Sequence, residues 1–173
     1  MPELIRYAFG HSSLGDFLAA TSALGLVAFE FGDRHAALID ALRQRFPEAM
    51  VEEDEAGLAE ATSQLAAMID QPNRESPLRL DPRGTDYQKR VWQVLREIPA
   101  GQTTTYSAVA AKLGTPRDAR ETTEAIAANT IAILIPCHRV VKKDGSLSGY
   151  RWGVRRKRAL LAREQTASAF QLT

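Results

Sequence analysis

The chain has 173 residues, enough for one sizeable core or two small ones, and its composition is ordinary for a globular protein. The formal net charge is +1, but residues 48–60 carry six acidic side chains and no basic one, whereas residues 137–165 carry nine lysines and arginines. The single cysteine excludes an internal disulfide and a multi-cysteine zinc site, so no metal is expected. The basic end is either a solvated face or a surface that meets a polyanion.

The sequence contains no recognisable signal peptide and no apolar run of about eighteen residues, so we expect no membrane span. A functional thiol would suit a reducing cytoplasm, which is the expected location.

The first third of the chain predicts a small sheet. Alternating apolar residues separated by turn residues indicate three short strands in an antiparallel meander, over residues 4–9, 15–21 and 25–31. His11 and His35 fall in a turn and at a helix start, and both are interpreted as solvent-facing.

Two helices are expected next. Asp33 is a candidate N-cap for a helix over residues 34–45, and an apolar stripe predicts a second helix over about 54–69. Residues 71–83 contain several prolines and no periodicity, which is typical of a linker between two subdomains.

The second half is predicted to be helical. The sequence from Thr85 to Gln88 has the form of a capping box that opens a helix to about residue 97. Thr105 is a candidate cap for a helix over 106–113. Thr115 and Pro116 can then open another helix that runs to about residue 128. Two short helices joined by a turn containing glycine indicate a helix-turn-helix, although plain helical hairpins share this pattern.

Cys137 follows an apolar run, residues 131–135, that is interpreted as a buried strand or extended segment. Pro136 interrupts this segment, so the thiol is presented at a break in regular structure, beside His138 and several cations. A lone cysteine is often only a small buried hydrophobe. The alternative is a nucleophile whose thiol is activated by the neighbouring imidazole.

The last helix is expected over residues 153–165. At about 100° per residue, Glu164 points in the same direction as Leu160 and Leu161, toward the interior. A carboxylate on a buried face needs a partner, which is either a structural cation or the histidine beside the thiol.

The segment Ile135-Pro136-Cys137-His138-Arg139-Val140, with Asn129 before it and Gly149-Tyr150 after it, resembles the active-site signature of the O6-methylguanine–DNA methyltransferases. The resemblance is strongest to the C-terminal methyltransferase domain of the bacterial adaptive-response protein, and it covers about residues 83–165.

This resemblance implies an α/β protein of two domains. Residues 1–80 would form a small antiparallel, ribonuclease H-like sheet with helices, and residues 81–173 a mainly helical, winged-helix-like helix-turn-helix domain with the active cysteine. The implied function is direct-reversal repair of double-stranded DNA: a methyl or alkyl group passes from O6-alkylguanine, or from O4-alkylthymine, to Cys137 in a single turnover. No cofactor is implied, and a monomer is expected.

The resemblance also implies roles for individual residues. Glu164 and His138 would relay a proton from Cys137 through a water, and Asn129 would hold the loop. Tyr106 would protonate or hydrogen-bond the leaving guanine and rotate the nucleotide, and Arg120 would fill the vacated base stack after base flipping. The alkylguanine pocket would be lined by Val140, Tyr150 and Arg151. Phosphates would be attracted by cations drawn from Arg139, Lys142, Arg151, Arg155 and Arg156.

One stretch departs from the family pattern. After Arg120 the family usually has small apolar residues on the helix that enters the minor groove, but this chain has Glu121-Thr122-Thr123-Glu124. Phosphates would repel these carboxylates unless they turn away or pair with Arg117 or Arg120. The departure favours one rival function, an alkyltransferase-like module that binds damaged DNA without efficient transfer. A second rival is a cysteine hydrolase or transferase that acts on small molecules.

Overall fold

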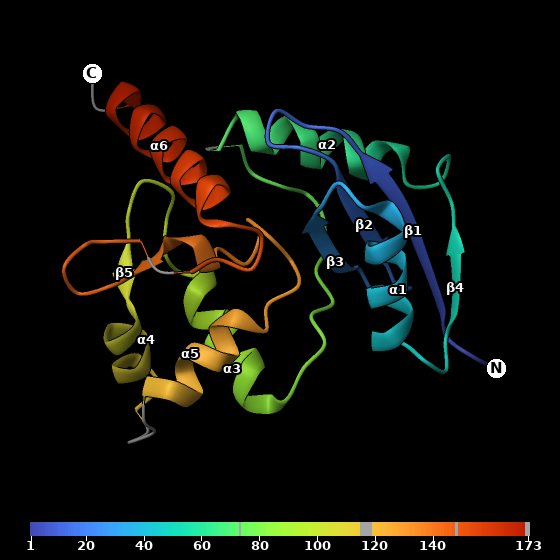
Figure 1. Ribbon diagram of the computed structural model, residues 1–173, viewed down its shortest axis with the longest axis horizontal. Helices are drawn as coiled ribbons and strands as arrows, with labels where there is room; N and C mark the ends of the chain where they lie inside the picture. The colour runs from blue at the N-terminus through green and yellow to red at the C-terminus, as the bar shows by residue number, and fades with distance from the viewer. Residues whose placement is uncertain (73, 115–118, 148, 172–173) are drawn as a thin grey trace. The chain divides into compact units, whose positions relative to one another are not determined.

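The computed structural model describes residues 1–72, 74–114, 119–147 and 149–171 (Figure 1). The chain divides into two compact units. The first comprises Met1–Asp70 and Glu75–Pro82, and the second comprises Gln71–Arg74 and Arg83–Thr173. Within the described residues, no helix has the length and apolar character needed to span a membrane.

The sheet of the first unit has the strand order β3-β2-β1-β4. The predicted antiparallel meander is confirmed, with strands β1 (Leu4–Gly10), β2 (Phe17–Thr21) and β3 (Leu26–Phe31). The fourth strand, β4 (Met50–Glu53), pairs in parallel with β1 and was not predicted. Its acidic residues are exposed and only Val51 is partly buried, so the segment lacks the apolar alternation that indicates a strand.

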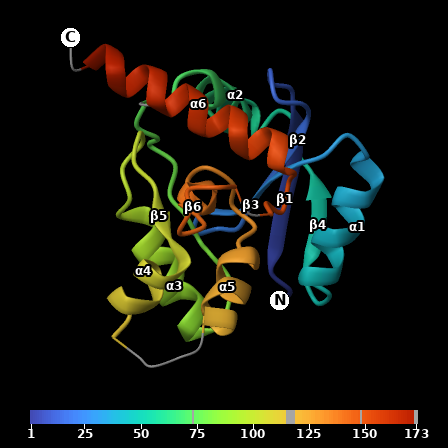
Figure 2. The ribbon, with the colours of Figure 1, turned by 60° about the vertical axis from the view of Figure 1, so that its left-hand side comes forward.

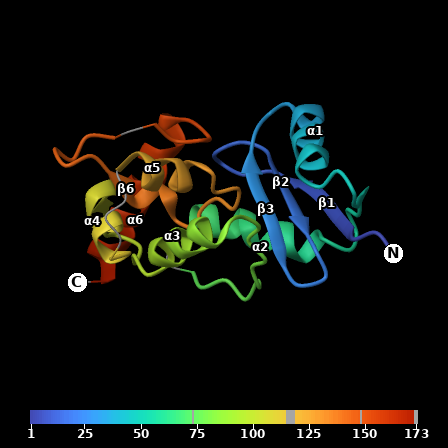
Figure 3. The ribbon, with the colours of Figure 1, turned by 90° about the horizontal axis from the view of Figure 1, so that it is seen from below.

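Two helices, α1 (His35–Arg45) and α2 (Ala59–Asp70), lie on either side of this sheet (Figure 3). Asp33 does not cap α1, because the N-cap position falls on Arg34, whose side chain makes no capping hydrogen bond. Helix α2 begins five residues later than predicted. Asp54 instead forms a turn, where its carboxylate accepts a hydrogen bond from the Gly57 backbone N–H at 2.9 Å.

The core of the first unit joins α1 to one face of the sheet through buried apolar side chains, namely Ile5, Tyr7, Leu18, Ala20, Val27, Ala28, Leu42 and Phe46. His11 and His35 each contact the carboxylate of Asp16, and the ring of His35 stacks on Phe9 at 3.8 Å. These contacts account for both histidines as structural residues of the first unit.

The second unit is mainly helical (Figure 2). Its long elements are α3 (Asp86–Arg96), α4 (Tyr106–Lys112), α5 (Ala119–Ala127) and α6 (Val154–Gln171). The capping box at Thr85 and Gln88 is confirmed, and the Thr105 side chain caps α4 by accepting from the Ala108 N–H at 3.1 Å. The predicted caps Thr115 and Pro116 lie outside the described residues. Helix α6 extends six residues beyond its predicted end, because the sequence there contains no glycine or proline to stop it.

A short parallel ladder joins β5 (Thr104–Thr105) to β6 (Val140–Val141). Strand β5 leads directly into α4, and β6 directly follows a single 3₁₀ turn, Cys137–Arg139. The ladder therefore connects the start of α4 to the segment that carries the cysteine.

The prediction of a strand or extended segment over residues 131–135 is wrong. The chain turns there instead: the Leu134 N–H donates to the Ala132 carbonyl at 2.6 Å, and Ile133 adopts the left-handed conformation with φ of 65°. This conformation is a marked outlier for a β-branched residue. The apolar run reflects burial of the turn, and buried turns and buried strands cannot be distinguished by hydrophobicity alone.

Candidate active site

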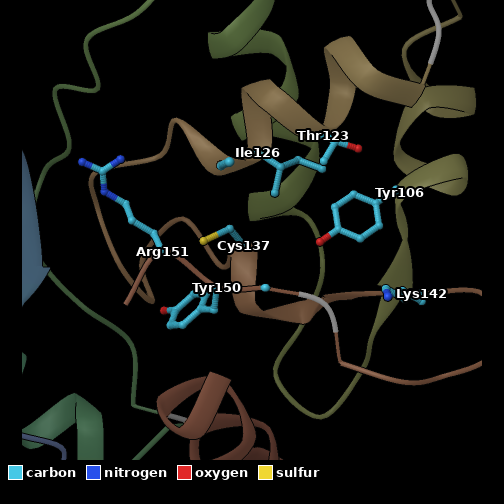
Figure 4. Close-up of a pocket in the computed structure, with 9 residues that line it drawn as sticks. Tyr106, Thr123, Ile126, Cys137, Lys142, Tyr150 and Arg151 are labelled. Carbon is cyan, nitrogen blue, oxygen red and sulfur yellow. The ribbon is translucent and has the colours of Figure 1, made fainter. Parts of the chain in front are cut away.

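Cys137 opens the 3₁₀ turn and is 7% exposed, beside a cavity of about 510 Å³ (Figure 4). The cavity is lined by residues from α4, α5 and the segment after the cysteine, namely Tyr106, Thr123, Ile126, Ala127, Cys137, Lys142, Gly149, Tyr150 and Arg151. The interpretation of Cys137 as a buried hydrophobe is therefore incomplete, because the sulfur adjoins a space large enough for a small organic group.

Burial raises the pKa of the Cys137 thiol to about 11. A hydrogen bond from Asn129 Nδ2 to the sulfur, at 3.3 Å, and the positive charges of Lys157 and Arg151 oppose this effect without overcoming it. The resting thiol is therefore protonated at neutral pH, and reaction as a nucleophile requires a base that removes its proton.

His138 and Glu164 form a buried pair, with Nε2 and Oε1 2.6 Å apart. Burial lowers the pKa of His138, whereas Glu164 opposes this shift. Burial alone would raise the pKa of Glu164, but hydrogen bonds from His138 and Arg139 hold it below its usual value. The arrangement is thus a neutral imidazole that donates from Nε2 to a carboxylate.

The second ring nitrogen of His138 is the only basic atom that this pair leaves available. Nδ1 is buried and has no hydrogen-bond partner within the part of the chain that the structure describes. Because the proton lies on Nε2, Nδ1 carries a lone pair and can accept a proton.

Arg139 is buried and belongs to the same network. Its guanidinium donates to both carboxylate oxygens of Glu164 at 2.9 to 3.2 Å, and to the Ile98 carbonyl at 2.6 Å. The expectation that Arg139 helps to attract phosphates is therefore wrong, since its charge is already paired inside the unit.

Asn129 organises the turn that precedes the cysteine. Its Nδ2 donates to the carbonyls of Ile131 and Ile135 at 3.1 and 2.9 Å, and its Oδ1 accepts from the Ile131 N–H at 2.9 Å. One side chain thereby satisfies backbone groups that a neighbouring strand would otherwise have to satisfy.

Two of the three predicted pocket residues line the cavity. Tyr150 and Arg151 line the cavity, but Val140 does not. Val140 is fully buried and its carbonyl accepts a hydrogen bond from Lys157 Nζ at 2.7 Å. The side chain of Tyr150 is buried, and its hydroxyl has no hydrogen-bond partner among the described residues.

Sequence reasoning did not place several residues at the cavity. Thr123, Ile126 and Ala127 bring α5 to the cavity wall, and Lys142, which was expected only as a phosphate-attracting cation, also lines the cavity (Figure 4). Lys157 is buried beneath the thiol segment. The helical spacing of Lys157 relative to Leu160, Leu161 and Glu164 was the available signal for its burial.

Arg120 lies on the exposed surface of α5. Its Nε is 3.9 Å from Glu124 Oε1, one helical turn away. One of the pairings expected for the acidic stretch is therefore present. Among the described residues, no group of three or more His, Cys, Asp or Glu side chains is suited to holding a metal ion.

Comparison with known proteins assigns this site to a family. Residues 86–166 match the family model of the 6-O-methylguanine DNA methyltransferase DNA-binding domain. The methylated-DNA–protein-cysteine methyltransferase of Mycobacterium bovis is 42% identical over 120 residues, which are 69% of this chain and 73% of that protein. The chain belongs to the methylated-DNA–protein-cysteine methyltransferase family.

Two further proteins that resemble this chain are informative. The bifunctional transcriptional activator/DNA repair enzyme Ada of Escherichia coli is 45% identical over 92% of this chain, but the match spans only 45% of Ada's length. The crystal structure of Mycobacterium tuberculosis OGT in complex with DNA superposes with a TM-score of 0.75 at 33% identity, covering 95% of this chain and 94% of the other. The predicted α/β methyltransferase fold is confirmed.

Proposed function

We propose that this chain repairs O6-alkylguanine in double-stranded DNA by transferring the alkyl group to Cys137. The observation that carries the proposal is the position of Cys137 beside an open cavity, next to a histidine whose buried Nδ1 has no partner among the described residues. Family membership supports the same reaction.

Both pKa shifts disfavour proton transfer from the resting thiol to His138, so activation needs a path for the proton and a stabilised imidazolium. The thiol holds its proton at neutral pH, and His138 is a neutral base nearby. We infer that a water links the Cys137 thiol to His138 Nδ1 and passes the proton on. Glu164 then stabilises the imidazolium, because its carboxylate is 2.6 Å from Nε2.

The alkyl carbon is attacked by sulfur and the carbon–O6 bond breaks. One S–C bond forms, the thiol proton goes to His138, and the departing guanine receives a proton from the hydroxyl of Tyr106, which lines the same cavity. The product is a thioether, and no group in the site cleaves a C–S bond. Each molecule therefore acts once.

The target base must leave the duplex to reach the sulfur, at a cost of a few kcal/mol. We infer that Arg120 on α5 replaces the extruded base in the stack, and that Tyr150 and Arg151 contact that base in the cavity. Every group in this scheme comes from one chain, so a monomer is sufficient for the reaction.

The direct test is to incubate the intact chain with a duplex containing one O6-methylguanine and to measure the protein mass and peptide map. We expect one added methyl group, located on Cys137, with a maximum of one per protein molecule. The Cys137→Ser variant should gain none while it still shifts the duplex in a gel.

The rival functions give different results in this test. A module that only binds damaged DNA would shift the duplex without any change in mass. A small-molecule hydrolase or transferase would show neither, and either result would overturn the proposal.

A further inference from the structure

The acidic residues at the start of α5 are the feature of the second unit that the proposed reaction leaves unused. Glu121 and Glu124 lie on the helix that carries Arg120. Negative charge close to phosphates weakens binding, so the effect of each carboxylate depends on which side of the helix it occupies.

The surface of α5 has three parts. The buried part consists of Thr122, Ala125 and Ile126. The part that lines the thiol cavity consists of Thr123, Ile126 and Ala127, of which the first two are labelled in Figure 4. A third, exposed part consists of Arg120, Glu121 and Glu124. A duplex that delivers a base to the cavity must therefore lie against the border between the second and third parts.

The two glutamates differ in their distance from that border. At about 100° per residue, Glu124 lies only about 40° around the helix from Arg120, and Glu121 lies about 100° from Arg120 in the same direction, away from the cavity. Glu121 is therefore on the side of α5 that faces α3. A second cavity of about 180 Å³ lies there, lined by both glutamates together with Thr85, Tyr87, Gln88 and Ala125. The first turn of α3, at the positive end of the dipole of that helix, favours negative charge.

Glu124 also contacts Arg120 directly. The pair is 3.9 Å apart, and the two side chains are 84% and 72% exposed. Such exposed pairs are weak and screened by salt, and an arginine four residues before a glutamate is the less favourable order. The contact thus offsets the charge of Arg120 in the free protein and is easily broken.

We propose that Glu124, and not Glu121, limits the affinity of α5 for duplex DNA by acting as a counter-charge to Arg120. The inference rests on the proposed function, which places α5 against the duplex. Glu124 offsets the charge of Arg120, the residue that the stacking role places beside the cavity border.

Paired single substitutions of the intact chain test this inference. Binding to an unmodified, fluorescently labelled duplex is measured by anisotropy at several salt concentrations. We expect Glu124→Gln to tighten binding roughly three- to tenfold at low salt and to steepen the slope of log affinity against log salt by about one. Glu121→Gln, the matched control, should change the affinity less than about twofold.

A double-mutant cycle tests whether Glu124 acts through Arg120. In an Arg120→Ala background, Glu124→Gln should tighten binding less than about twofold. Equal effects of the two glutamate substitutions, or an undiminished gain without Arg120, would overturn the inference.

Failure of this inference is distinguishable from failure of the proposed function. If Glu124→Gln leaves the affinity unchanged while Cys137 still accepts a methyl group, only the counter-charge role is wrong. If Cys137 of the unaltered chain stays unmethylated, the repair function is wrong, and the binding data still decide the role of Glu124.

Discussion

At the scale of single residues, the chemistry of the site depends on the burial of Cys137 and His138. The Pro-Cys-His-Arg motif and the inward phase of Glu164 were sufficient to select Cys137, His138 and Glu164 from the sequence. They were not sufficient to predict that the thiol has a pKa of about 11, because that value depends on burial by residues from distant segments. That His138 Nδ1 has no hydrogen-bond partner among the described residues is likewise visible only in three dimensions.

Alkylation of Cys137 by iodoacetamide should report the raised pKa of the thiol. We expect the rate to rise about tenfold per pH unit up to a pH near 11, since the thiolate is the reacting species. Asn129→Asp should slow alkylation roughly tenfold at each lower pH, because it replaces the Nδ2 donor to sulfur with a negative charge.

The same pH profile provides its own control for folding. An unfolded variant would expose the thiol and move the inflection down to about 8.5, opposite to the expected direction. An Asn129→Asp profile that coincides with that of the unaltered chain would show that Asn129 does not stabilise the thiolate.

At the scale of elements, local sequence patterns predicted the positions of most helices correctly. The capping box of α3 and the cap of α4 were predicted because they depend on residues within one turn. The parallel strand β4 and the turn at residues 131–135 were not predicted, because each depends on a distant partner or on the side chain of Asn129.

Glu164 on helix α6 contacts His138 and Arg139 of the thiol segment, and we expect these contacts to be essential for stability. We expect Glu164→Gln to lower the free energy of unfolding by about 3–5 kcal/mol, because it leaves the buried guanidinium of Arg139 without its carboxylate. Urea denaturation measures this change. Thr166→Ala, on the exposed surface of the same helix, should cost less than about 0.5 kcal/mol, and equal losses would contradict the structural role of Glu164.

At the scale of the whole molecule, the sequence indicated a boundary near the linker but gave no information on how it folds. The structure assigns Glu75–Pro82 to the first unit, where Leu80 forms a bridge with Leu26 and Asp81 accepts a hydrogen bond from the Ser22 hydroxyl at 2.6 Å. Neither contact has a periodic signature in the sequence, because each joins single residues more than fifty positions apart.

Acid should destabilise the second unit through His138. Its pKa is lowered by burial, so below a pH of about 6.5 the unfolded chain binds a proton that the folded chain does not. The free energy of unfolding should then fall as the pH drops, by at most about 1.4 kcal/mol per pH unit from this group. Below pH 4.5, the usual pKa of this carboxyl, Glu164 reduces the free energy of unfolding further, because its pKa is also lowered in the folded chain.

Tryptophan fluorescence is a suitable readout, because the chain's two tryptophans, Trp92 and Trp152, are both buried in the second unit. Urea titrations between pH 7.5 and 5.5 should show the loss in the unaltered chain and a flatter dependence in His138→Gln. If the free energy of unfolding of His138→Gln falls with pH as steeply as that of the unaltered chain, the acid sensitivity comes from other groups.

The two-residue ladder between β5 and β6 has a consequence for engineering this protein. It fixes the backbone next to Tyr106 relative to the backbone that follows Cys137, and both of these residues line the cavity. Replacing Thr123 by a smaller residue would enlarge the room for a bulky adduct, yet the distance between these two backbone segments would stay the same. To accept still larger adducts, the peptide segments before β5 and after β6 would have to change in length.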